Sequence, residues 1–124
     1  MTRDEIDTAI GVHELWKTRL QWAINNASGK LEVRVEDIRA DNACTFGKWL
    51  YGSTITTDET ASSYYISIKE LHTQFHIAAA QVAELIIENK TAEAVELLAP
   101  GSKYALISTK LISTMKEWKN QIFP

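Results

Sequence analysis

The sequence predicts an all-α fold, an antiparallel four-helix bundle in which a short helix carries the single cysteine. Apolar residues recur at helical spacing along most of the chain. Only two prolines and five glycines interrupt the 124 residues. The length suits one domain with one core, so residues 1–124 are expected to form a single domain.

The first helix is expected from Arg3 to about Ser28, and Gly29 follows it as a residue suited to a helix C-terminus. Its apolar stripe consists of Ile6, Ile10, His13, Trp16, Leu20, Ile24 and Ala27. From Lys30 to Ala43, apolar and charged residues alternate as in a strand, but one short strand would have no partner. We therefore expect a connecting loop over these residues.

A short second helix is expected to begin near Ala43 and to end before Gly52, with Asp41 or Asn42 as its N-cap. The third helix opens at Thr57 or Asp58, since acidic residues favour a first turn, and ends near Asn89. Its apolar stripe consists of Tyr64, Ile68, Leu71, His72, Phe75, His76, Ala79, Ala83 and Ile86.

The fourth helix is expected from Ala92 to about Gln121, with Thr91 as its cap. Pro100-Gly101-Ser102 must kink or split it, because proline removes a backbone donor and clashes with the preceding turn. Three long amphipathic segments and one short one together predict the antiparallel bundle.

Composition excludes several classes of function. Thirteen Lys and Arg against sixteen Asp and Glu give a net charge of −3, which does not suit a nucleic-acid partner. The longest apolar run, Ile77 to Ile87, is too short to insert into a membrane. The N-terminus shows no signal-peptide core, and a single cysteine cannot form an internal disulfide. A cytoplasmic location is therefore expected.

The three histidines and the cysteine occupy suggestive positions. His72 and His76 are four residues apart, so both project from one helix face and can bind one metal ion. His13 lies within the apolar stripe of the first helix, and Cys44 lies at the start of the short helix. Three imidazoles and one thiolate form a complete tetrahedral donor set for Zn²⁺.

Chain lengths allow these four residues to meet. His13 lies about 22 Å from the end of its helix, and the His72–His76 pair lies about 24 Å from the start of the third helix. If these two helices are antiparallel, the levels coincide. Each residue alone also has a simpler explanation, because a single buried histidine is commonly hydrogen-bonded and a lone cysteine commonly acts as a small apolar residue. The four taken together favour a metal site.

Three segments resemble the chemoreceptor zinc-binding (CZB) domain family. They are His13-Glu14-Leu15-Trp16, the block Cys44-Thr45-Phe46-Gly47-Lys48-Trp49-Leu50-Tyr51, and His72-Thr73-Gln74-Phe75-His76. The resemblance extends over nearly the whole chain. It implies that His13, Cys44, His72 and His76 are the ligands of one zinc ion in a four-helix bundle.

The neighbouring residues fit such a site. Gly47 would let the short helix pack closely on a long one, and Trp16 and Trp49 would form an apolar wall around the metal. The ring nitrogens not bound to zinc would donate to a carboxylate or a carbonyl. The candidate carboxylates are Glu14, Asp37, Asp41 and Glu70.

The resemblance also implies a regulatory function in bacterial signalling and chemotaxis, in which the site responds to zinc or to oxidants such as hypochlorous acid. Partners would be a second copy of the chain, a chemoreceptor or a diguanylate cyclase. An enzyme is not expected, because four protein donors leave no position for water and no HExxH motif is present. The alternative is a helical interaction module whose zinc is purely structural.

Overall fold

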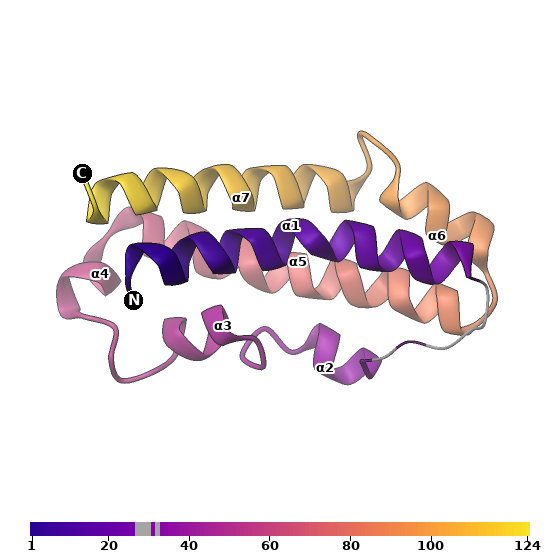
Figure 1. Ribbon diagram of the computed structural model, residues 1–124, viewed down its shortest axis with the longest axis horizontal. Coiled ribbons are helices and arrows are strands. Elements are labelled where there is room, and N and C mark those ends of the chain that lie inside the picture. The colour runs from indigo at the N-terminus through magenta and orange to yellow at the C-terminus, as the bar shows by residue number, and fades with distance from the viewer. Residues whose placement is uncertain (27–30, 32) are drawn as a thin grey trace.

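The computed structural model describes residues 1–26, 31 and 33–124, and these residues form seven helices and no strand. Three helices are long and run along the length of the molecule (Figure 1): α1 (Arg3–Asn25), α5 (Ser63–Ile87) and α7 (Lys103–Ile122). Four are short: α2 (Val35–Arg39), α3 (Thr45–Leu50), α4 (Thr57–Ala61) and α6 (Thr91–Leu98). The all-α prediction is therefore confirmed.

The directions of the long helices follow from two contacts. Lys119 near the end of α7 forms an ion pair with Asp7 near the start of α1, and Ser62 at the start of α5 donates to Gln121. Helices α1 and α5 therefore both begin where α7 ends, so they are parallel to each other and antiparallel to α7 (Figure 1). The condition under which the chain lengths were compared, antiparallel first and third helices, therefore does not hold. The segment with α2 and α3 returns the chain along their length, so α5 starts at the same end as α1.

Several helix boundaries differ from the predicted ones. The expected loop over residues 30–43 contains α2, which places Ile38 in the core at 2% exposure. The expected third helix is interrupted at Ser62, whose backbone is extended and whose hydroxyl accepts from the Tyr64 amide. This side chain satisfies a helix-start donor and so favours a new helix there. Gly29 and the predicted end of the first helix at Ser28 lie outside the described residues.

The helix ends also differ in their caps. Cys44 is the N-cap of α3, in place of Asp41 or Asn42. Helix α5 ends at Ile87, and Asn89 has a positive φ of 61° that turns the chain toward α6. The predicted break at Pro100-Gly101-Ser102 is confirmed, because α6 ends at Leu98 and Ser102 caps α7.

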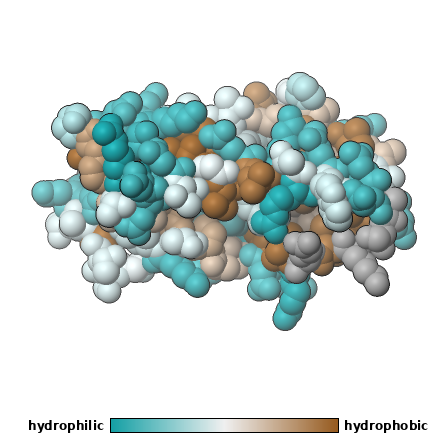
Figure 2. All heavy atoms as spheres, in the orientation of Figure 1, coloured by the Kyte–Doolittle hydropathy of each residue, from teal (hydrophilic) through white to brown (hydrophobic). Residues whose placement is uncertain are grey.

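The core lies between α1, α5 and α7, with α2 and α3 covering one side. Its largest fully buried residues include Phe46, Phe75, Leu111, Met115 and Trp118. The face seen in Figure 2 is mostly hydrophilic, with small apolar areas between the hydrophilic residues. None of the helices among the described residues is long and apolar enough to cross a membrane.

Candidate metal centre

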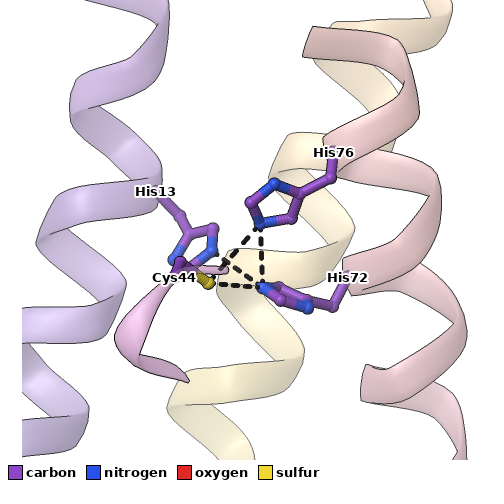
Figure 3. A group of neighbouring side chains, drawn as sticks. All are labelled: His13, Cys44, His72 and His76. Carbon is purple, nitrogen blue, oxygen red and sulfur yellow. Dashed lines mark hydrogen bonds between the residues drawn. The ribbon is translucent and has the colours of Figure 1, made fainter. Parts of the chain in front are cut away.

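Four potential metal ligands meet inside the fold, although they come from three separate segments. His13 lies on α1, Cys44 precedes α3, and His72 and His76 lie one turn apart on α5 (Figure 3). Their donor atoms all lie within 4.8 Å of one another. The Nε2 atom of His72 lies 3.1 Å from Nε2 of His13 and 3.1 Å from Nε2 of His76. The Cys44 sulfur lies 3.3 Å from Nε2 of His72 and 3.6 Å from Nε2 of His76.

Backbone carbonyls orient two of the imidazole rings. Nδ1 of His13 donates to the Ala9 carbonyl at 2.7 Å, and Nδ1 of His76 donates to the Ile38 carbonyl at 2.7 Å. A carbonyl only accepts, so the proton must lie on Nδ1 and the lone pair on Nε2 must face the cluster. The acceptors are therefore these carbonyls rather than the carboxylates of Glu14, Asp37, Asp41 or Glu70. Ile38 belongs to α2, the helix that the sequence did not predict.

This arrangement places lone pair against lone pair unless a cation is present. Nε2 of His72 can donate to one neighbour at most, and Nδ1 of His72 is buried with no partner among the described residues. The Cys44 thiol can donate one further proton, so at most two of these four contacts are hydrogen bonds and the remaining ones lack a proton between the two atoms. A cation in the middle would convert every one of these contacts into a favourable one.

The spacing of the donors fits zinc. Zinc forms bonds of about 2.05 Å to nitrogen and about 2.3 Å to sulfur, so a tetrahedral ion separates its ligand atoms by about 3.3 Å for two nitrogens and about 3.6 Å for nitrogen and sulfur. Four of the six separations, at 3.1, 3.1, 3.3 and 3.6 Å, lie close to these values, and the other two, from His13 to Cys44 and to His76, are within 4.8 Å. A set of three imidazoles and one thiolate is also typical of zinc. These residues therefore fit a tetrahedral zinc ion.

Burial prepares the imidazoles for metal binding. His13, His72 and His76 are 1%, 0% and 3% exposed. Desolvation lowers the pKa of His13 to about 4 and that of His72 to about 3, and it lowers the pKa of His76 as well. All three rings are therefore neutral at neutral pH, which is the form that binds metal.

Cys44 differs from the histidines in its environment. The side chain is half-buried, and desolvation raises the pKa of its thiol despite hydrogen bonding from the amides of Gly47 and Phe46. The Gly47 amide lies 3.3 Å from the sulfur, so Cys44 is both the cap of α3 and a candidate ligand. A thiol with a raised pKa keeps its proton at neutral pH until a cation stabilises the thiolate.

Aromatic rings enclose the cluster, but they are not the two predicted. Phe46 packs edge-on against His13 and His72, and Phe75 packs edge-on against His13 and His76. Trp49 lies behind Phe46, between it and Trp118. Trp16 is half-buried and stacks with Arg19, 4.1 Å from its ring, so the predicted Trp16 wall was wrong. The motif did not reveal that Phe75 packs against the candidate ligands, because the direction of its side chain depends on how α5 packs against α1.

Asp41 ties the segment before Cys44 to α5. Its carboxylate accepts from the Thr73 hydroxyl at 2.5 Å and from the Tyr51 hydroxyl at 2.6 Å, and we call this group the Asp41 clasp. Burial raises the pKa of Asp41, but these two hydrogen bonds and the nearby His72 and His76 together hold it below its usual value. The clasp joins the loop before α3, the end of α3 and the residue beside His72.

Gly47 permits a very close backbone approach. A Cβ atom at this position would lie 1.7 Å from the Asp41 carbonyl oxygen. The glycine therefore lets α3 pack on the loop that precedes it, and not on a long helix as predicted. The clasp and this approach both hold Cys44 near the α5 histidines. The only sequence signals for them were the glycine itself and the position of Thr73 next to His72.

Comparison with known proteins identifies the family. The family model of the chemoreceptor zinc-binding domain matches residues 13–83, a range that includes all four candidate ligands. The match stops before α6, so it covers less of the chain than the motifs had suggested. No curated protein and no solved structure matches the chain. Since the match covers more than half of the residues, the chain belongs to the chemoreceptor zinc-binding domain family.

Proposed function

We propose that this chain is a regulatory domain of a bacterial signalling protein that responds to zinc and to oxidants such as hypochlorous acid. The observation that carries the proposal is the convergence of Cys44 with His13, His72 and His76 around one point. Two of the rings are also held with Nε2 facing that point. We infer one Zn²⁺ per chain, because all four donors come from the same chain and complete a tetrahedral set.

The same donor set supports a centre without catalytic activity. A catalytic zinc site keeps one position for water or substrate, and here four protein atoms would occupy all the positions. Phe46 and Phe75 also pack against the rings of His72 and His76. We therefore propose that the chain is not an enzyme.

Zinc sensing would follow from the protonation of the free site. The three imidazoles are neutral near pH 7, so the Cys44 thiol is the one group that must lose a proton when the metal binds. Occupancy would therefore depend on the zinc activity around the protein and on pH, with one proton released for each zinc ion bound. A large apolar core, including Phe75, Leu111 and Trp118, supports a fold that persists when the site is empty.

Oxidant sensing would act on Cys44. Bound zinc would hold this sulfur as a thiolate, the form that oxidants attack. The thiolate electron pair attacks the chlorine of hypochlorous acid and hydroxide leaves. Hydroxide then replaces chloride on the sulfur, so that Cys–S⁻ and HOCl yield Cys–SOH and Cl⁻. The sulfur is oxidised by two electrons and the chlorine is reduced by two. A sulfenic acid is a much poorer metal ligand than a thiolate.

The movement of α3 would transmit the change. Cys44 caps α3 through its sulfur, so oxidation alters the metal ligand and the helix cap at once. Helix α3 is otherwise held by the Asp41 clasp, by the hydrogen bond from the Tyr65 hydroxyl to the Leu50 carbonyl and by its buried apolar side chains. Such a short helix, tied by few polar bonds, can serve as the element with two positions. We infer that α2 and α3 together take the place of the second helix in a four-helix antiparallel bundle.

The output would pass through protein contact in the cytoplasm. Exposed apolar side chains occur on all three long helices, such as Trp22 at 59%, Ile66 at 67% and Leu106 at 63%. These side chains support a partner that is a second copy of the chain or a signalling protein of the chemoreceptor or diguanylate cyclase type. The net charge of −3 supports a partner other than nucleic acid.

The proposal is tested by metal analysis and oxidation of the purified chain. We expect one zinc per chain by elemental analysis and retained helicity by circular dichroism after chelation. One equivalent of hypochlorous acid should add one oxygen to Cys44, release zinc to a chromogenic chelator and increase hydrogen exchange over residues 44–50. Cys44→Ala is the matched control, because it removes the only thiol but leaves both methionines, Met1 and Met115, in place.

The outcomes separate the two functions. Loss of helicity on chelation would favour a purely structural zinc. A Cys44→Ala variant with unchanged zinc affinity, or a wild-type protein that keeps its zinc after Cys44 is oxidised, would refute the sensor.

A further inference from the structure

A surface pocket leads to the candidate metal centre from one side. It lies between the first turns of α1 and the start of α3 and has a volume of about 240 Å³. Its lining includes Cys44 and His13 from the candidate metal centre, and Val12, Thr8, Asp4 and Glu5 from α1. A water molecule occupies about 30 Å³ of liquid, so the pocket has room for several waters or one small reactant.

The pocket reaches the one candidate ligand that is not sealed off. His13, His72 and His76 are at most 3% exposed, whereas Cys44 is half-buried. His72 and His76 do not belong to the lining, and Phe46 and Phe75 pack against their rings. A reactant that enters here therefore meets the Cys44 sulfur first.

The charge on the pocket is negative. Asp4 and Glu5 are both exposed, and no basic residue is found among the described residues that line it. The capping box fixes Glu5, since the Thr2 amide donates to its carboxylate at 3.0 Å. The helix start, whose dipole is equivalent to about +0.5 charge, and the Met1 ammonium, which acts on Glu5, offset these two negative charges only in part. The local field therefore repels anions and attracts cations.

We propose that this pocket is the entrance through which small reactants reach Cys44, and that Asp4 and Glu5 make it select uncharged or cationic reactants over anions. The proposal rests on the proposed function only for the identity of those reactants. In that function they are a neutral oxidant, such as undissociated hypochlorous acid, and the divalent cation. Hypochlorite and other anionic oxidants would be disfavoured.

The charge selection is tested on the metal-free protein with three methanethiosulfonate reagents. One carries a neutral methyl group, one a trimethylammonium group and one a sulfonate group. In each case the Cys44 thiolate attacks the sulfenyl sulfur, a disulfide forms and methanesulfinate leaves. The ratio of the cationic to the anionic rate cancels the intrinsic reactivity of the thiolate, so it reports the field along the path.

The matched variants remove two charges from different places. Asp4→Asn/Glu5→Gln, the rim variant, neutralises both acidic residues of the pocket, and glutamine can still serve in the capping box. Glu93→Gln/Glu96→Gln makes the same change in net charge on α6, at the opposite end of the molecule (Figure 1). We expect the rim variant to lower the rate ratio about fivefold at low salt and the α6 variant to change it less than twofold. In 1 M salt, where the Debye length falls to about 3 Å, the difference should vanish.

A second pair of variants tests the path itself. Val12 lines the pocket, whereas Leu15 lies one turn further along α1 and is not part of the lining. Both side chains are exposed, Val12 at 42% and Leu15 at 52%. Val12→Trp should slow modification by the neutral reagent at least about fivefold by filling the pocket, and Leu15→Trp should leave the rate within about twofold. Circular dichroism confirms that both variants remain helical.

Each result tests one claim: the entrance, its charge selection or the sensor function. Equal neutral-reagent rates for Val12→Trp and Leu15→Trp would show that Cys44 is reached by another route, and the entrance would be wrong. An unchanged rate ratio in the rim variant would overturn the charge selection. If the entrance behaves as expected but oxidised Cys44 still retains zinc, the entrance stands and the sensor function fails.

Discussion

Substituting alanine for Gly47 tests how the structure positions Cys44. The added Cβ would lie 1.7 Å from the Asp41 carbonyl oxygen, 2.8 Å from its carbon and 3.1 Å from Cα of Asn42. An ordinary contact between carbon and oxygen is about 3.3 Å, so the two segments must separate by about 1.5 Å. The obstructing atoms are all backbone, and they cannot turn away as a flexible side chain would.

This displacement is large compared with what a metal site tolerates. Metal–ligand distances stay within about 0.2 Å of their preferred values, and Cys44 lies only three residues before Gly47. We expect Gly47→Ala to weaken zinc binding by at least about tenfold. The free energy of unfolding should fall by about 1–3 kcal/mol, because overpacking outweighs the gain of about 1 kcal/mol that alanine normally brings to a helix interior.

Gly11→Ala provides the matched control. Gly11 lies inside α1, and a Cβ there would meet nothing within 4 Å. The same substitution should therefore raise the free energy of unfolding by about 0.5–1 kcal/mol and leave zinc affinity unchanged. Urea denaturation and chelator competition measure the two quantities. If Gly47→Ala retains wild-type zinc affinity and stability, the close approach does not position Cys44 and this reasoning is wrong.

Three further predictions concern protonation and an unpaired hydroxyl. In chelator competition, zinc affinity should rise about tenfold per pH unit between pH 6.5 and 8, because only Cys44 must lose a proton. A much steeper slope would mean that histidines of the metal-free site are also protonated. In urea denaturation, the metal-free protein should lose stability as pH falls from 6.5 to about 4, because the unfolded chain binds more protons than buried His13 and His72; a flat profile would contradict the lowered pKa values. Tyr104→Phe should raise the free energy of unfolding by about 1 kcal/mol, because it removes a buried hydroxyl without a partner among the described residues; a clear loss would show that the hydroxyl is bonded.

Local rules in the sequence were enough for much of the fold and of the candidate site. Residues four apart on a helix share a face, so the spacing of His72 and His76 was sufficient to pair them. Proline and glycine at 100 and 101 predicted the break between α6 and α7 for equally local reasons. The four donors also meet as the motif implied, although the chain length used to argue this assumed the wrong helix direction.

Contacts between distant segments were decided only by the tertiary structure. Backbone carbonyls orient His13 and His76, and every residue has a carbonyl, so no residue type marks the one from Ile38 that is used. The Asp41 clasp and the parallel course of α1 and α5 likewise depend on how the segments pack. Helical periodicity defines which face of each helix is buried, but it carries no information about which other helix packs against that face. The ligand types are therefore a property of the sequence, and their orientation is a property of the packed chain.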